Sequence, residues 1–305
     1  MPFTPSNMST DGCERLGLKQ HGFYALSSLT NFGQGSCQEG ITDLDIKKME
    51  SEIIEREWSW NQPVIQDILL KYYRDWLFVT PEIAKNMVER ILSISKLQPP
   101  GQVLDIGCGL GYHAAVFAQK GFQVMAFDPG DKYLKIAQSH IAMEGVDVIL
   151  RRMKCADLDE FERFSLAWAG SYCPGQLPPS DVKQDFRRIY KALKPGGWFI
   201  SNVAGKPKVP PSEKERSWRK LSDCYALSEK WADKTYFHEH CWFVYPELNK
   251  VIKLVEVERM YGIEEILPLL EEAGFKDIST ANRLKGGEPA QTGNHFAFWC
   301  RKPNA

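Results

Sequence analysis

The sequence predicts an α/β fold built on a mostly parallel, doubly wound sheet, and the stretch from residue 102 to residue 130 carries the evidence. A short apolar run at 103–106 passes directly into a glycine-rich loop at 107–111, a pattern typical of a buried parallel strand. An amphipathic segment at 112–119 follows, and a second apolar run at 124–127 ends in Asp128. Strand, glycine loop, helix and strand in this order form the first half of a nucleotide-binding α/β domain.

The same alternation continues along the chain. A helix is expected to begin at Thr80 and Pro81, because threonine is a good N-cap and proline suits the first helical position. Further helices are expected at about 131–143 and 181–193. Further strands are expected at 146–150, 164–168 and 198–203.

The amino-acid composition limits the classes of function that the protein can have. The 305 residues are 43% hydrophobic and 25% charged, as in an ordinary globular protein. The 38 basic and 39 acidic residues give a net charge of −1, which provides no electrostatic signature for nucleic acid or an anionic membrane. No apolar run approaches the ~18 residues of a membrane span, and the N-terminus lacks a signal-peptide layout. Eight cysteines without a C-x-x-C pair favour reduced thiols, so we expect a cytoplasmic protein.

Three regions are expected. Residues 1–42, rich in small polar residues, are predicted to form a mobile arm. Residues 43–98 are predicted to be helical, starting with a pattern that includes Ile53 and Ile54 and continuing into an aromatic segment that either packs onto the sheet or covers the site as a lid. Residues 99–305 form the core, and residues 205–260 are an insertion with a strand pair that turns at 246–250.

The glycine spacing indicates which nucleotide binds. A dinucleotide fingerprint needs a third small residue at position 112, where Tyr112 stands, so a nicotinamide oxidoreductase is disfavoured. The pattern D-x-G-x-G-x-G at 105–111 resembles motif I of the class I methyltransferases that use S-adenosylmethionine (SAM). The turn L-K-P-G-G at 193–197 and the segment from Arg259 to the A-G-F at 273–275 resemble the same superfamily.

This resemblance implies a seven-stranded Rossmann-like sheet, an N-terminal helical lid, a late β-hairpin insertion and SAM as the cofactor. The last strand, at 295–301, would be antiparallel and would lie between the fifth and sixth strands. The match also implies that Asp128 holds the ribose and that Asp157 lies near the adenine, although Lys154 competes for that place in the alignment. The predicted cofactor-binding residues are Asp105, Gly107, Cys108, Gly109, Gly111, Asp128, Pro129, Asp157 and Trp168.

The acceptor is expected to be a small molecule, because the Asn/Asp-Pro-Pro-aromatic tetrapeptide of nucleic-acid amino methyltransferases is absent after the fourth strand. A general base is required only if the nucleophile carries a proton at neutral pH. The candidate catalytic residues are His238, Glu239, His240 and Tyr172. In a strand, His238 and His240 would share one face and Glu239 would lie on the other. His113 is expected to pack in its helix or to contact the methionine end of SAM. A nucleic-acid or protein methyltransferase, and a non-catalytic SAM-binding protein, remain as alternatives.

Overall fold

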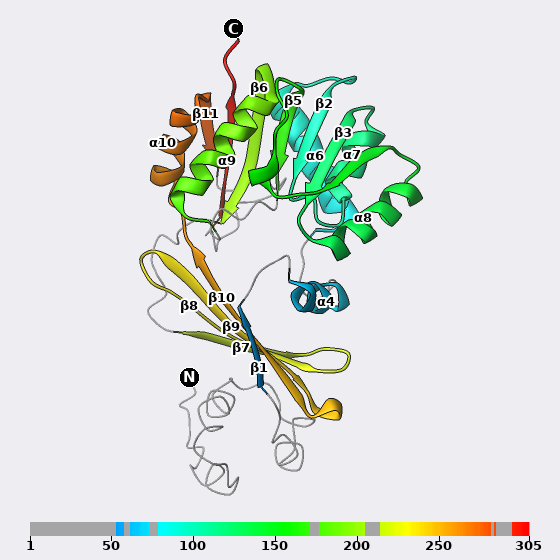
Figure 1. The fold of residues 1–305 in the computed structure, drawn as a ribbon, viewed down its shortest axis with the longest axis vertical. Helices are drawn as coiled ribbons and strands as arrows, with labels where there is room; N and C mark the ends of the chain where they lie inside the picture. Colours follow the sequence, from blue (N-terminus) through cyan, green and yellow to red (C-terminus); the bar gives the residue numbers. More distant parts are fainter. Residues whose placement is uncertain are drawn as a thin grey trace, which may run out of the picture. The chain divides into compact units, whose positions relative to one another are not determined.

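The computed structural model describes residues 53–57, 62–72, 79–170, 177–204, 214–281, 284 and 295–304. The chain divides into two compact units, which are described separately. The larger unit contains a seven-stranded sheet with its helices, and the smaller unit contains most of a five-stranded sheet (Figure 1). The predicted mobile arm at residues 1–42 lies outside the described residues.

The seven-stranded sheet has the predicted topology. Its strand order is β11-β12-β6-β5-β2-β3-β4. The neighbours from β6 to β4 pair in parallel, whereas β12 is antiparallel to both β6 and β11. The predicted place of the last strand, between the fifth and the sixth, is therefore confirmed. The strands are β2 (Gln102–Ile106), β3 (Gln123–Asp128), β4 (Val148–Arg152), β5 (Phe164–Ala169), β6 (Leu193–Ala204), β11 (Lys276–Ala281) and β12 (His295–Arg301).

Helices cover both faces of this sheet, as the doubly wound fold requires (Figure 1). On one face, apolar side chains of α9 and α10 pack against β2, β3 and β6. On the other face, α6 and α7 pack against the same sheet, and α8 packs beside α7. The helices are α4 (Pro63–Lys71), α6 (Pro81–Ser95), α7 (Tyr112–Gln119), α8 (Asp131–Met143), α9 (Pro179–Ala192) and α10 (Ile263–Ala273). None of these helices, nor any other in the described part of the chain, is long and apolar enough to cross a membrane.

The start of α6 shows the predicted capping. Thr80 is the N-cap, and its hydroxyl oxygen accepts a hydrogen bond from the backbone N–H of Ile83 at 3.2 Å. Pro81 occupies the first helical turn, where its missing N–H costs no hydrogen bond.

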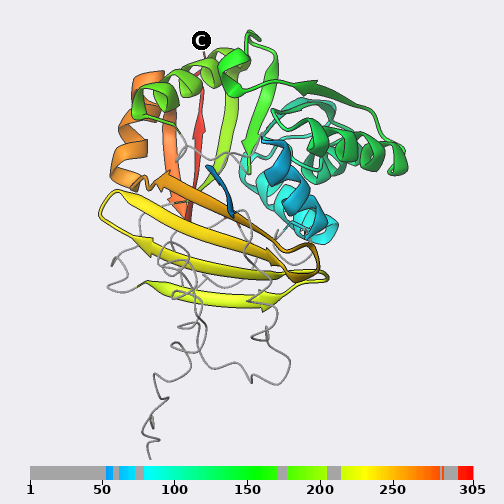
Figure 2. The ribbon, with the colours of Figure 1, turned by 60° about the horizontal axis from the view of Figure 1, so that its bottom comes forward.

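The smaller unit's sheet is wider than the sequence indicates. Its order is β1-β10-β9-β8-β7, and the strands lie side by side in Figures 1 and 2. The predicted strand pair is present as β9 (Tyr236–Tyr245) and β10 (Lys250–Arg259), joined through the turn at Pro246–Leu248. Two strands precede it, β7 (Glu215–Lys220) and β8 (Tyr225–Ala232), which pair antiparallel. All six residues of β7 are exposed, so this strand has no apolar alternation by which to recognise it.

The helical prediction is wrong at Ile53 and Ile54. Both lie in β1 (Ile53–Glu57), which pairs in parallel with β10. Branching at Cβ disfavours isoleucine in helices and favours it in strands, and pairing with β10 decides the outcome. Residues 43–52, 58–61 and 73–78 of the predicted helical region lie outside the described residues.

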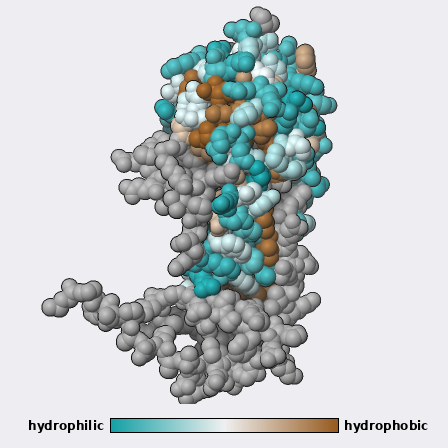
Figure 3. Space-filling model, turned by 90° about the vertical axis from the view of Figure 1, so that its left-hand side faces the viewer, coloured by the Kyte–Doolittle hydropathy of each residue, from teal (hydrophilic) through white to brown (hydrophobic). Residues whose placement is uncertain are grey.

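Figure 3 shows the side of the larger unit on which α10 and β11 lie. Hydrophilic residues dominate this face, and hydrophobic residues gather in a patch among them. Because more than half of a typical protein surface is apolar, such a patch does not by itself mark a binding site.

Candidate functional site

The loop between β2 and α7 contains three glycines in the left-handed region, with φ of 66° at Gly107, 53° at Gly109 and 77° at Gly111. A Cβ at Gly111 would lie 3.0 Å from the Cβ of Ala137 in α8, so this glycine allows helix and loop to pack closely. A Cβ at Gly109 would meet no atom of the described residues within 4 Å. Gly109 therefore leaves an open side on the loop, where a ligand can approach the backbone.

Asp128, at the end of β3, fastens this loop. Its Oδ2 accepts a hydrogen bond from the backbone N–H of Gly109 at 3.0 Å, and its Oδ1 accepts one from Gly130 at 2.8 Å. The N–H of Cys108 also donates to the carbonyl of Phe127 at 2.9 Å. Burial raises the pKa of Asp128, while the two backbone donors act in the opposite direction. Since each carboxylate oxygen has two acceptor positions, Asp128 retains capacity for a ligand's donors.

Asp105, in β2, lies directly behind the loop and is 1% exposed. The N–H of Ala114, in the first turn of α7, donates to its carboxylate. Asp105 thus accepts a hydrogen bond from the first turn of α7, which the N-cap residue Gly111 cannot do because it has no side chain. Its other oxygen, Oδ2, has no hydrogen-bond partner among the described residues. Burial and then the charge of Asp128 raise the pKa of Asp105 to about 7. A cationic group beside Oδ2 would satisfy this oxygen and favour the ionised form.

The raised pKa of Asp105 predicts that the stability of the protein depends on pH in a way that can be tested. The pKa of Asp105 rises from 3.8 to about 7 on folding. The carboxyl group therefore loses its proton at a lower pH in the unfolded chain than in the folded protein. The contribution of Asp105 to stability is therefore fully present below about pH 4 and is lost as the pH rises to 7. Asp105→Asn removes this dependence. The free energy of unfolding of the variant relative to the native protein should rise by on the order of 3 kcal/mol between pH 5 and pH 8.

Urea denaturation of both proteins at the two pH values measures this difference. The buried His113, whose pKa burial lowers to about 4, affects both proteins equally and cancels. Asp147→Asn, at an exposed position, is the control and should show no such trend. An Asp105→Asn difference that is equal at pH 5 and pH 8 would contradict the assignment.

Tyr133 is a site residue that the sequence reasoning missed. It lies in the first turn of α8, and its buried hydroxyl has no hydrogen-bond partner in the described structure. Burial and then the charge of Asp128 raise the pKa of Tyr133. A Cβ at Gly130 would lie 2.5 Å from the Cδ2 of Tyr133, so the ring packs over the Pro129–Gly130 turn. In the sequence, only Gly130, two residues after Asp128, indicates this arrangement.

Comparison with known proteins shows to which family a chain with this fold and this glycine loop belongs. Residues 103–197 match the model of a methyltransferase domain, a range that includes the glycine loop, Asp128 and the L-K-P-G-G segment at the start of β6. The chain is a class I SAM-dependent methyltransferase. The predicted recognition is therefore confirmed.

Relatives and solved structures agree with this methyltransferase domain. A Geobacillus sp. (strain WCH70) protein with a provisional methyltransferase name is 26% identical over 232 residues, which are 72% of this chain and 91% of that protein. A SAM-dependent methyltransferase from Clostridium acetobutylicum has a TM-score of 0.64 at 16% identity, covering 79% of this chain and 98% of its own. A SAM-bound amino pentose methyltransferase from Micromonospora echinaspora has a TM-score of 0.59 at 16% identity, covering 77% and 96%.

Helix α4 of the methyltransferase lies against the start of α8, next to the Asp128 turn. The Oε1 of the buried Gln66 accepts a hydrogen bond from the N–H of Lys132 at 3.0 Å, and Lys132 also forms an ion pair with Asp67. Tyr72, just after α4, is buried, whereas Tyr73 lies outside the described residues. This docking agrees with both interpretations of the N-terminal segment, as packing helices and as a lid, and the lid stays a prediction.

Asp157 ends the short 3₁₀ turn Cys155–Asp157 after β4 and is exposed. Its Oδ2 accepts a hydrogen bond from the N–H of Lys154 at 2.9 Å. One carboxylate oxygen therefore stabilises the turn, and the other remains for a ligand. The adenine role of Asp157 stays a prediction.

The histidines proposed for catalysis lie in β9, in the five-stranded sheet. The ring of His238 stacks on Trp231, with centroids 4.9 Å apart, and the ring of His240 contacts the same indole edge-on at 4.8 Å. The Oε1 of Glu239 accepts a hydrogen bond from Ser228 at 2.8 Å instead. The two histidines thus share a face, as the strand alternation predicts. Their catalytic role stays a prediction, and Tyr172 lies outside the described residues.

His113 is part of the packing of α7. Its ring centroid lies 5.5 Å from that of Trp168 in an edge-to-face contact. Burial lowers the pKa of His113 to about 4, so the imidazole is neutral at pH 7. The packing role expected from the sequence agrees with this contact.

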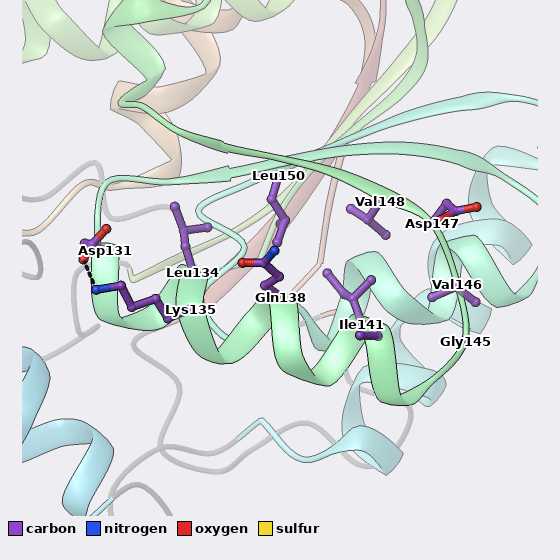
Figure 4. Close-up of a pocket in the computed structure, with 11 residues that line it drawn as sticks. Asp131, Leu134, Lys135, Gln138, Ile141, Gly145, Val146, Asp147, Val148 and Leu150 are labelled. Carbon is purple, nitrogen blue, oxygen red and sulfur yellow. Dashed lines mark ion pairs between the residues drawn. The ribbon is translucent and has the colours of Figure 1, made fainter.

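A groove of about 760 Å³ runs between α8 and β4, as Figure 4 shows. Leu134, Ile141 and Val148 give it apolar walls, and an ion pair of 3.0 Å joins Asp131 to Lys135 at one end. No glycine of the 107–111 loop lines this groove. It is therefore a separate feature from the loop and Asp128.

Proposed function

We propose that this methyltransferase transfers the methyl group of SAM to a small organic acceptor by in-line displacement. The observation that carries the proposal is the hydrogen bond between Asp128 and Gly109. One carboxylate oxygen of Asp128 accepts the N–H of Gly109 at 3.0 Å, next to the open side of that glycine. A sugar-binding acid is thereby held at the edge of a loop with room for a ligand.

The residues present fit SAM. The loop would hold the methionine end, with the unpartnered Oδ2 of Asp105 as the acceptor for a cationic group. Asp128 would bind the ribose hydroxyls, and Asp157 would lie near the adenine. The proposed cofactor-binding residues are Asp105, Gly107, Cys108, Gly109, Gly111, Asp128, Pro129, Asp157 and Trp168.

SAM supplies an electrophilic methyl group on a positively charged sulfur, and that charge disappears during transfer. The chain's contribution is to align the acceptor and to exclude water. The buried Cys108 and Trp168 beside the loop provide an apolar surround for this purpose. If the acceptor carries a proton at neutral pH, His238, Glu239, His240 and Tyr172 are the proposed groups to orient it or remove it.

Two facts support a small acceptor over a nucleic acid. The net charge of −1 gives no general attraction for a phosphate backbone. One structural neighbour is named for its action on an amino pentose, which is a small molecule.

The test uses SAM labelled in its methyl group, incubated with the protein and three separate pools of metabolites, RNA and denatured proteins. We expect the label in the metabolite pool, at a level that Asp128→Ala lowers at least about tenfold. Asp147→Ala, at an exposed position, is the matched control. Label found in RNA or protein but not in metabolites would overturn the small-molecule assignment.

A further inference from the structure

Three neighbouring strands present polar atoms without partners on one face of the larger sheet. The atoms are Oδ2 of Asp105 in β2, Nε1 of Trp168 in β5 and Oδ1 of Asn202 in β6, all buried and without a hydrogen bond in the described structure. Asp105 pairs with Trp168, and Trp168 pairs with Ile200, two residues before Asn202. Because side chains alternate along a strand, the three share one face.

The indole of Trp168 lies along its own strand toward the strand's carboxyl end. Trp168 is 0% exposed. A Cβ built at Gly170 would lie 2.4 Å from Cζ2 of this indole and 2.9 Å from Nε1. The ring edge formed by Cζ2 and Nε1 therefore lies where a side chain of residue 170 would begin, and only a glycine at this position leaves room for it.

The same point lies opposite Asn202. Ala169 pairs with Ser201, so the register places Gly170 across from Asn202. Neighbouring strands lie about 4.7–4.9 Å apart, so the side chains of residues 170 and 202 would begin at about that separation. The edge of the Trp168 indole and the side chain of Asn202 therefore lie at the same level of two adjacent strands. The indole N–H and the Asn202 carboxamide oxygen do not bond to each other, and each lacks any other partner among the described residues.

Buried polar groups are nearly always hydrogen-bonded, so a donor and an acceptor left open side by side indicate a missing bridging group. Such a group must offer a lone pair to Trp168 and a hydrogen to Asn202. Methyl transfer requires one further lone pair on the same atom. A hydroxyl has one hydrogen and two lone pairs, whereas a neutral amine has only one lone pair.

We propose that Trp168 and Asn202 hold the hydroxyl group of the acceptor, so that the enzyme is an O-methyltransferase acting on an alcohol or a phenol. This proposal rests on the function proposed above. The acceptor oxygen forms a bond to the methyl carbon, and the carbon–sulfur bond breaks with its electron pair going to sulfur. The hydroxyl proton leaves as the new bond forms and is taken up by the general base that the proposed function assigns to an acceptor carrying a proton. His113, in edge contact with Trp168, keeps the indole in place.

Matched acceptor pairs that differ only in O–H or N–H test the atom. We would assay phenol with aniline, and a hexose with its 4-amino-4-deoxy counterpart, using methyl-labelled SAM. The hydroxyl member should be methylated at least about tenfold faster in each pair that reacts. Faster methylation of the amine member would overturn the proposal.

Trp168→Phe tests the residue, because it keeps an aromatic ring and removes the N–H. We expect it to lower kcat/KM for the hydroxyl acceptor about 10- to 100-fold. Because phenylalanine keeps an aromatic ring beside the cofactor, the dissociation constant for S-adenosylhomocysteine should rise by a smaller factor than kcat/KM falls. Trp218→Phe, an exposed position in β7, is the matched control and should change neither value. An unchanged kcat/KM in Trp168→Phe would overturn the proposal.

A binding experiment covers the case in which no acceptor of the panel reacts. The indole N–H signal of Trp168, identified by its loss in Trp168→Phe, is followed by NMR in the presence of S-adenosylhomocysteine. It should shift on adding the hydroxyl member of a pair and stay unchanged with the amine. A signal that responds to no hydroxyl compound would contradict the proposal. Failure of the native protein to bind S-adenosylhomocysteine would instead refute the function on which it rests.

Discussion

Replacing Asp128 by alanine is expected to weaken SAM binding about 100-fold or more. The carboxylate is assigned the two ribose hydroxyls, and hydrogen bonds to a charged group contribute about 1.5–3 kcal/mol each. A loss of about 3 kcal/mol corresponds to about 100-fold in the dissociation constant. The variant also releases the N–H groups of Gly109 and Gly130 that Asp128 accepts, so the loop loses its attachment.

Isothermal titration calorimetry with SAM and with S-adenosylhomocysteine measures this loss. Asp128→Asn should fall between the native protein and alanine, because its amide oxygen accepts one N–H while its NH₂ group repels the other. Asp147→Ala, an exposed acid before β4, should bind normally. Far-ultraviolet circular dichroism checks that each variant is folded. An Asp128→Ala protein that is folded and binds SAM within about threefold of the native affinity would remove Asp128 from the site.

Alanine at two glycines of the loop should affect folding and binding to different degrees. At Gly111, a Cβ would be strained by the φ of 77° and would lie 3.0 Å from the Cβ of Ala137. Left-handed backbone costs about 1–2 kcal/mol and overpacking about 1–3 kcal/mol. Gly111→Ala should therefore lower the free energy of unfolding by about 2–5 kcal/mol. In Gly109→Ala the new methyl group meets no atom within 4 Å in the part of the chain that the structure describes, so it should cost only the backbone strain, about 1–2 kcal/mol.

The effect on SAM binding should be large at Gly109, where the effect on stability is small. The methyl group of Gly109→Ala would occupy the open side assigned to the ligand, so SAM affinity should fall at least about tenfold in a protein that is still folded. Gly145→Ala is the matched control, because Gly145 also has positive φ (66°) and open space but lies at the groove between α8 and β4. It should show a similar loss of stability and native affinity. Native SAM affinity in Gly109→Ala would contradict the assignment of the open side.

Local signals predicted the core of the methyltransferase well. The helices α7 and α8 begin and end at the residues expected from periodicity, Tyr112–Gln119 and Asp131–Met143. Glycines, the proline turn and short apolar runs mark their ends in the sequence itself. The same spacing indicated Asp128, and the structure places its carboxylate on the glycine loop.

Features that depend on distant parts of the chain were not predicted. Strand β1 forms through pairing with β10, almost 200 residues later, and the exposed β7 shows no apolar alternation. The open hydroxyl of Tyr133 and the pair formed by Trp168 and Asn202 are recognisable only from burial and missing partners. Such properties belong to the packed protein and leave no pattern in the sequence.

A crystal structure of the protein with S-adenosylhomocysteine tests the central claim most directly. We expect the ribose hydroxyls within hydrogen-bond distance of Asp128, about 2.6–3.2 Å, and the ligand's amino acid end against Gly109. The nucleoside bound elsewhere, for example in the groove between α8 and β4 with Asp128 free of it, would contradict the account.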